Sequence, residues 1–195
     1  MSKPKSPRPS PIERLDLNVS RAVALDREDP PGRWVRRFAE LGDQPPLLAL
    51  CGGVVAAGLV RRDERLARTG LRMLAAHSLA TMAKTLVKNS INRTRPGALK
   101  DKKYRLEEGD SRDGRLRSMP SGHSAGTVAV AGAIAADYPR GLVPVSVIST
   151  AVMSAQLPSR NHFLTDVIAG AAIGFAATAA ARLLIPAHDR ADPAR

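Results

Sequence analysis

Apolar residues gather in five runs along the chain, and short charged or proline-containing stretches separate these runs. The length of the runs and their helical spacing predict five main helices, because strands are usually much shorter. No alternation typical of β-strands has any weight, so the sequence predicts an all-α bundle. The five runs are residues 46–60, 70–87, 124–136, 142–157 and 167–186. Gly170 and Gly174 are spaced for close contact with another helix.

The region before these runs has a different character. Residues 1–12 are rich in Lys, Arg, Ser and Pro and predict a disordered basic tail. Residues 13–27 and 34–41 show weaker amphipathic patterns, separated by Pro30 and Pro31. We expect these two pieces to lie on a membrane surface, or alternatively to cap a soluble bundle. The sequence thus predicts one domain over residues 13–186, with a C-terminal tail at 187–195.

A full membrane span needs about 20 apolar residues, and several of the runs are shorter. Helices whose ends carry a polar site can be lengthened by the residues of that site. We therefore predict a membrane-embedded bundle of about five main helices with an amphipathic N-terminal region. No apolar segment follows the basic start, so no cleavable signal peptide is expected.

Composition narrows the range of partners. The net charge is +12 and the aromatic content is 3%, so anionic partners are favoured but stacking on single-stranded nucleic acid is not. We expect no nucleic-acid partner. Cys51 is the single cysteine and lies in an apolar run, which predicts a small core residue and excludes a disulfide within the chain.

The residues Pro120-Ser121-Gly122-His123 stand between a charged loop and an apolar run, which is typical of a helix start. Ser121 can cap the helix, and Gly122 allows close approach to the backbone. The free N–H groups of a first helical turn favour an anion. His123 in that turn is placed to exchange a proton with the group to which the anion is attached. An incidental histidine in a capped helix is the competing interpretation.

Two other stretches favour the chemical interpretation. Lys88 and Arg95 lie at the end of an apolar run that stops at Pro96. His162 and Asp166 open the last run, four residues apart. A carboxylate on one imidazole nitrogen fixes the tautomer and leaves the other nitrogen as a nucleophile. Since each stretch borders an apolar segment, all three can meet at one end of a helical bundle.

Together these stretches resemble the type 2 phosphatidic acid phosphatases, whose superfamily also contains class A acid phosphatases and vanadium haloperoxidases. Residues 88–96 match Lys-x6-Arg-Pro, and residues 120–123 match Pro-Ser-Gly-His. The third family motif, Ser-Arg-x5-His-x3-Asp, is shortened here, because one residue separates Arg160 from His162. The resemblance extends over about residues 46–185.

The resemblance implies a metal-independent phosphatase without a cofactor. His162 would attack phosphorus and form a phosphohistidine, Asp166 would stabilise its imidazolium, and His123 would serve as acid and then as base. The phosphate ligands would be Lys88, Arg95, Ser121, Gly122 and Arg160. The substrate would be a phospholipid or a polyprenyl (di)phosphate in the bacterial cytoplasmic membrane, with the site on the extracytoplasmic side.

Alternatives remain at two levels. A vanadate-dependent haloperoxidase uses the same pocket, and a basic membrane-binding or nucleic-acid-binding protein needs no catalysis. At residue level, Arg93 or a cation of the connection 97–119 could replace Arg160. Arg160 and His162 would diverge by about 200° on a helix. If Arg160 is a ligand, the fourth main helix must therefore end by about Leu157, the last must begin at or after Asn161, and Arg93 should matter little.

Overall fold

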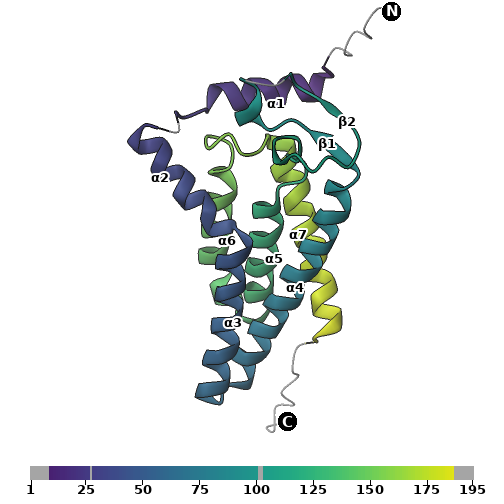
Figure 1. Cartoon of the computed structure of the whole chain (residues 1–195). Helices are drawn as coiled ribbons and strands as arrows, with labels where there is room; N and C mark the ends of the chain where they lie inside the picture. Colours follow the sequence, from purple (N-terminus) through teal and green to yellow (C-terminus); the bar gives the residue numbers. More distant parts are fainter. Residues whose placement is uncertain (1–8, 27, 101–102, 187–195) are drawn as a thin grey trace, which may run out of the picture.

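The structure, a computed structural model, describes residues 9–26, 28–100 and 103–186. Within them, five long helices form a bundle and two shorter helices lie near one of its ends (Figure 1). The helices are α1 Pro11–Ala22, α2 Pro30–Ala39, α3 Gln44–Arg61, α4 Glu64–Lys88, α5 Gly122–Asp137, α6 Leu142–Ser154 and α7 Leu164–Leu184. Short 3-10 turns are Glu40–Gly42, Pro96–Ala98, Gly114–Leu116 and Pro139–Gly141, and the strands are β1 Ile91–Arg93 and β2 Leu106–Glu108. The predicted all-α class is confirmed.

The predicted disordered tail at 1–12 is too long. Helix α1 begins at Pro11 because Ser10 and Glu13 form a reciprocal cap, in which each side chain accepts from the other residue's backbone N–H. Residues 1–8 and the predicted tail at 187–195 lie outside the described residues.

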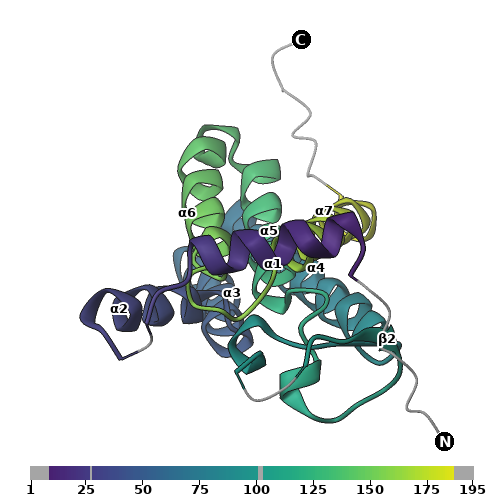
Figure 2. The ribbon, with the colours of Figure 1, turned by 90° about the horizontal axis from the view of Figure 1, so that it is seen from above.

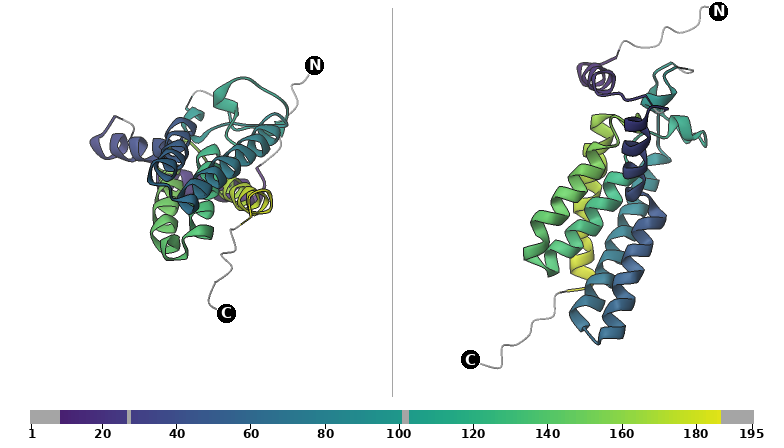
Figure 3. Two further views of the ribbon diagram at one scale, coloured as in Figure 1. Left: turned by 90° about the horizontal axis from the view of Figure 1, so that it is seen from below. Right: turned by 90° about the vertical axis from the view of Figure 1, so that its left-hand side faces the viewer.

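The long helices run beside one another, and α5 packs against α4, α6 and α7 (Figures 1 and 3). Small residues let them approach closely. A Cβ built at Gly170 would lie 2.3 Å from the carbonyl oxygen of Ser121, and one at Gly174 would lie 2.7 Å from that of Ala125. The predicted contact face of α7 is confirmed. It fixes the start of α7 against the start of α5, where the polar motifs lie.

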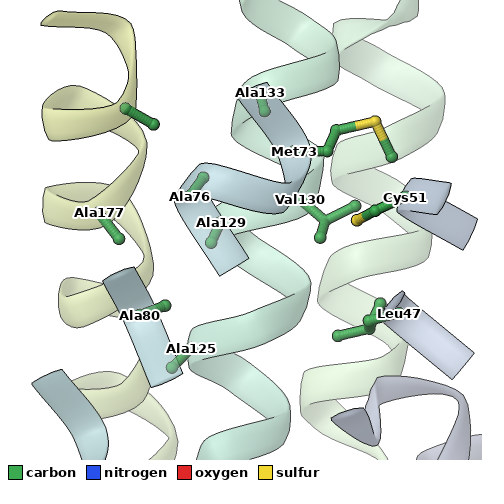
Figure 4. Close-up of a cluster of buried hydrophobic side chains, with 11 residues drawn as sticks. Leu47, Cys51, Met73, Ala76, Ala80, Ala125, Ala129, Val130, Ala133 and Ala177 are labelled. Atoms are coloured by element: carbon green, nitrogen blue, oxygen red, sulfur yellow. The ribbon is translucent and has the colours of Figure 1, made fainter. Parts of the chain in front are cut away.

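The core between the helices is built mainly from alanine, and larger side chains fill one side of it (Figure 4). Cys51 of α3 is fully buried there, as predicted, beside Met73 of α4 and Val130 of α5. Short side chains leave little apolar surface to bury per residue, so close backbone approach and polar contacts must supply part of the packing.

The flanks of the bundle are apolar toward the outside. Within the described part of the chain, α3 and α7 are long and apolar enough to cross a membrane. Large apolar side chains stand exposed along the outer helices, among them Val60, Val143, Val147, Phe175 and Leu183. In water such a surface would be unfavourable, whereas in lipid it needs no cover. The bundle is therefore membrane-embedded.

The connection between α4 and α5 holds a small hairpin that the sequence did not predict. Strands β1 and β2 pair antiparallel, with Ile91 opposite Glu108 and Arg93 opposite Leu106. Each strand has three residues, which is too short for a period of two to be recognised. The hairpin extends into the site, because Ser118 N–H donates to the carbonyl of Arg93 over 3.1 Å.

A polar clamp closes the opposite end of the bundle. Arg72 of α4, which is 1% exposed, pairs with Asp137 at the end of α5 and donates to the carbonyl of Ile185 just beyond α7. Thr69 also donates to Asp137 over 2.9 Å. The buried Arg72 guanidinium thus connects α4 with Asp137 of α5 and with the residue that follows α7.

The clamp makes a prediction about stability. Asp137→Ala leaves the Arg72 guanidinium buried without its counter-charge, and breaking one partner of such a pair costs about 3–5 kcal/mol. We expect a clearly lowered unfolding midpoint in detergent, followed by circular dichroism. Asp110→Ala is the control, because Asp110 is 63% exposed in its ion pair with Arg117. Equal midpoints for the two variants would show that the clamp contributes nothing.

Candidate functional site

The three motif stretches converge at the end of the bundle beneath α1 (Figure 1). Lys88 is the last residue of α4, His123 lies in the first turn of α5, and His162 precedes α7. The ring centroids of His123 and His162 are 5.6 Å apart, and the planes meet at 66°. Two imidazoles from residues far apart in sequence therefore face one small volume.

His162 is held by the backbone. It is 1% exposed, and its Nδ1 lies 2.7 Å from the carbonyl oxygen of Ser118. Since a carbonyl only accepts, Nδ1 must carry the proton, and Nε2 keeps its lone pair. The ring is thus held in the tautomer that a nucleophilic imidazole requires.

Asp166 does not make the contact that its spacing predicted. Its Oδ2 is 3.9 Å from Nδ1 of His162, too far for a hydrogen bond. Oδ2 instead accepts from the hydroxyl of Ser118 over 2.6 Å and from the N–H of Phe163 over 2.8 Å. The expectation fails because α7 begins at Leu164, so His162 lies outside the helix that was assumed to align the pair. Ser118 connects the two residues, because its hydroxyl donates to Asp166 and its carbonyl accepts from His162.

The surroundings of His162 keep it neutral. Burial, followed by the positive charges of Arg95 and Lys88 and the neighbouring His123, places the pKa of His162 well below its usual value. These causes also indicate that Arg95, Lys88 and His123 lie near the ring. A neutral imidazole with a free Nε2 can attack an electrophile, and the two cations can hold that electrophile's negative oxygens.

His123 has a partner that sequence reasoning missed. Its Nε2 lies 2.7 Å from Oδ1 of Asp43, the residue that precedes α3. In the sequence, Asp43 stands just before a proline-containing helix start, which predicts a helix cap. No sequence pattern connects residue 43 with residue 123. Burial lowers the pKa of His123 below its usual value, and the charges of Arg95, Lys88 and Lys84 add to this, whereas the Asp43 carboxylate opposes them by favouring the protonated imidazole, the form that can donate a proton.

Lys84 is a second residue that was missed. A Cβ built at Gly122 would lie 3.0 Å from Nζ of Lys84, so this ammonium covers the glycine at the start of α5. Lys84 lies one helical turn before Lys88, and that spacing could have revealed it. Lys88 itself donates to the carbonyl of Arg117 over 3.0 Å, which points its ammonium toward the same end.

Ser121 caps α5 as predicted. Its hydroxyl accepts from the N–H of Ser124 over 3.3 Å, and its own N–H donates to the carbonyl of Asp166 over 2.9 Å. Ser121 is 0% exposed, so its hydroxyl serves the helix start in this structure. The α5 start is thereby joined to the α7 start.

The shortened third motif is non-helical, as predicted. α6 ends at Ser154, α7 begins at Leu164, and residues 155–160 between them form turns. Arg160 has φ 57°, and its carbonyl accepts from Gly97 N–H over 2.9 Å. A cavity of about 440 Å³ is lined by Arg95, Gly97, Ala98, Gly114, Arg115, Arg160 and Asn161. Arg160 and Arg95 therefore share a cavity.

Gln156 holds this turn and was not predicted to matter. It is 0% exposed, and its carbonyl accepts from the N–H groups of Asn161 and His162 over 3.1 and 3.4 Å. Its side-chain amide donates to the carbonyl of Ala39 over 3.1 Å. The main-chain carbonyl of Gln156 thus holds the turn, and its side-chain amide connects the turn to the end of α2.

Arg93 is not available as a substitute for Arg160. It is 2% exposed and pairs with Asp16 and Asp166, each over 2.6 Å. Its removal would leave two buried carboxylates without their counter-charge, which argues against the expectation that Arg93 matters little. Lys100 belongs to the described part of the connection, whereas Lys102 lies outside it.

Metal-binding groups were considered across the same described ranges. Within residues 9–26, 28–100 and 103–186, no three His, Cys, Asp or Glu side chains come together to hold a metal ion. The titratable groups of the site are instead two imidazoles, two carboxylates and several cations.

Comparison with known proteins identifies relatives of this arrangement. A profile of the PAP2 superfamily matches residues 69–190. The structure is similar to a transmembrane PAP2 type phosphatidylglycerolphosphate phosphatase from Bacillus subtilis, with TM-score 0.65, 20% identity and coverage of 89% of this chain and 85% of that chain. It is also similar to Aquifex aeolicus LpxE, with TM-score 0.59, 21% identity and coverage of 86% and 94%. No curated protein sequence matches the chain significantly.

The state of His162 can be measured directly. Because its pKa lies well below 6.5, we expect His162 to remain neutral at pH 6.5, with the proton on Nδ1. Nitrogen NMR of histidine-labelled protein in detergent reads out both the charge and the tautomer, and His162→Gln assigns the signal. A signal that titrates at or above pH 6.5, or one with the proton on Nε2, would contradict the geometry.

Proposed function

The chain belongs to the PAP2 superfamily, and on that premise we propose that it is a membrane phosphatase that hydrolyses the terminal phosphate of a lipid. The observation that carries the proposal is the histidine pair. His162 donates Nδ1–H to Ser118, and its neutral ring faces His123 at 5.6 Å. This arrangement supplies a nucleophile and a proton donor on either side of one small volume.

The proposed first step transfers the phosphoryl group to His162. Nε2 attacks phosphorus, the bond from phosphorus to the lipid oxygen breaks, and the electron pair leaves with that oxygen. Protonated His123 gives its proton to the departing oxygen. The imidazolium of His162 keeps its bond to the Ser118 carbonyl, with the Asp166 carboxylate 3.9 Å away to stabilise the charge.

The second step releases phosphate. Neutral His123 takes a proton from water, the water oxygen attacks phosphorus, and the bond from phosphorus to Nε2 breaks. His162 returns to its neutral form and His123 to its protonated form, so both are ready for another cycle. Asp43 supports this exchange because it favours the protonated ring at 2.7 Å.

Cations hold the phosphoryl oxygens in this proposal. Lys88, Arg95 and Arg160 are the ligands that the motifs suggest, together with the N–H of Gly122 in the first turn of α5. Lys84 adds a further ammonium over that turn. The transferred group spreads negative charge over three oxygens, so several fixed cations stabilise the transition state. Ser121 is proposed as a ligand only if its hydroxyl leaves the helix cap.

The apolar surroundings support a lipid as the substrate. An apolar groove of about 480 Å³ lies between α2 and α6, lined by Trp34, Val35, Phe38, Ala151, Ser154, Ala155 and Pro158. Pro158 of this groove belongs to the same turn as Arg160, which lines the basic cavity. We propose that the groove takes a hydrocarbon chain of the substrate, which stays in the bilayer while its phosphate reaches the cations.

One of the two similar structures is a phosphatidylglycerolphosphate phosphatase, which supports a lipid phosphate as the substrate. We propose a multi-pass location in a bacterial cytoplasmic membrane, with the site on the extracytoplasmic side. Phosphatidate, phosphatidylglycerol phosphate and polyprenyl diphosphate all present a terminal phosphate at an apolar surface, and they form the set to be tested.

The test is phosphate release by purified protein in detergent from these three lipids, with and without EDTA. Release should survive EDTA, because no step uses a metal. His162→Ala should lower it by about 10,000-fold or more, since it removes the nucleophile. Arg140→Ala is the control, because Arg140 is exposed and lies between α5 and α6.

Three outcomes would refute the proposal. They are near-normal release by folded His162→Ala, full loss of release in EDTA with rescue by magnesium, and halide oxidation with added vanadate in place of release. The last result would favour a haloperoxidase.

Asp43 gives a prediction about pH. Asp43→Asn removes the negative charge that stabilises protonated His123, which lowers the pKa of His123. His123 then loses its proton at a lower pH than in the wild type. The alkaline limb of the kcat profile should then move to lower pH. Glu40→Gln is the matched control, because Glu40 is an exposed acid three residues away. An unchanged profile would show that Asp43 does not govern the proton donor.

A further inference from the structure

Helix α1 crosses the site end of the bundle (Figure 2), and its buried residues are polar. Asp16 and Ser20 are buried, at 0% and 5% exposure, whereas Ile12 and Leu15 are 64% and 54% exposed. An amphipathic helix that packs by hydrophobic burial would show the reverse. Contacts of the buried polar residues must therefore decide where α1 lies on the bundle.

Asp16 caps the start of α7 from another helix. Its Oδ1 accepts from the N–H of Thr165 over 3.0 Å, and its Oδ2 accepts from the Thr165 hydroxyl over 2.5 Å. Thr165 is the second residue of α7, where backbone N–H groups have no partner within the helix. A carboxylate there is favoured by the helix dipole as well. The cap fixes the helix start that follows His162.

The same carboxylate orients Arg93. Nη2 of Arg93 donates to Asp16 over 2.6 Å, while Nη1 donates to Asp166 over 2.6 Å and to the Thr165 hydroxyl over 2.7 Å. The guanidinium also lies 4.5 Å from the ring centroid of Phe163. Its planar fork is thereby held between two carboxylates and against the residue next to His162.

From Arg93 the path continues to the catalytic ring. Asp166 accepts from Ser118 over 2.6 Å, and the Ser118 carbonyl accepts from His162 over 2.7 Å. Four hydrogen bonds therefore join Asp16 to His162 through side chains that are at most 2% exposed. In so buried a network one missing member shifts the others, because each polar group must keep a partner.

We propose that Asp16 is a positioning residue for His162, acting through Arg93, Asp166 and Ser118. The inference rests on the proposed phosphatase function. It goes beyond that function because Asp16 lies outside residues 69–190, which match the superfamily profile. The N-terminal helix of this chain thus completes a site whose motif residues all come from elsewhere.

The test compares Asp16→Ala with wild type and with Ser20→Ala, in the full chain in detergent. Ser20 is buried on the same face of α1, but the hydrogen bonds to His162 do not run through it. For Asp16→Ala we expect kcat to fall by about 10- to 100-fold with KM little changed, because displacement of a reacting group by about 1 Å has this effect. Ser20→Ala should retain kcat.

A second measurement does not depend on activity. Hydrogen exchange of peptides that cover residues 162–166 should become about tenfold faster in Asp16→Ala, since Thr165 N–H loses its acceptor. If Asp16→Ala fails to fold, Asp16→Asn replaces it. The asparagine keeps an acceptor for Thr165 but loses the charge that faces Arg93, so a smaller fall of kcat in the same direction is expected.

The outcomes distinguish a failure of the role proposed for Asp16 from a failure of the proposed phosphatase function. Unchanged kcat in a folded Asp16 variant, an equal loss in Ser20→Ala, or unchanged exchange of residues 162–166 in Asp16→Ala would overturn the role of Asp16. A wild-type protein that releases no phosphate from any of the lipids would refute the proposed function, and exchange would still decide whether Asp16 holds the segment of His162.

Discussion

The buried guanidinium of Arg93 is the constraint from which the site is built. An arginine keeps its charge in a protein, so at 2% exposure it must be surrounded by acceptors. Asp16 and Asp166 meet this need at its two terminal nitrogens, and Asp166 in turn holds Ser118 and the N–H of Phe163. The hairpin, the start of α7 and the N-terminal helix are therefore joined at one charge, and the histidine pair lies beside it.

The close approach of the α5 and α7 backbones is the second constraint on the site. Gly170 and Gly174 bring α7 against α5, and the N–H of Ser121 reaches the carbonyl of Asp166 as a result. The two helix starts that carry His123 and His162 thus form one unit. The Arg72 clamp closes the other end, so relative sliding of α4, α5 and α7 would break polar contacts at both ends.

The sequence predicted the helices well because each apolar run is long and is bordered by charges, caps or prolines. It also identified His123, His162, Lys88 and Arg95 as one group, since motifs at helix ends converge in a bundle. It could not reveal Asp43 or Asp16, whose partners are 77 or more residues away along the chain. The contact of Asp166 was predicted wrongly, because α7 begins at Leu164, two residues after His162, so the helix does not align that ring with Asp166.

The acceptor of the His162 proton is a main-chain oxygen, and this has a consequence for how the site can change over time. Every residue type possesses a main-chain carbonyl, so no substitution at position 118 removes that acceptor. The tautomer of His162 therefore depends on the backbone conformation and not on the side chain at position 118. The side chains that support this conformation carry no such protection. Sequence drift in this protein should therefore affect the supports of the nucleophile before it affects the chemistry of the ring itself.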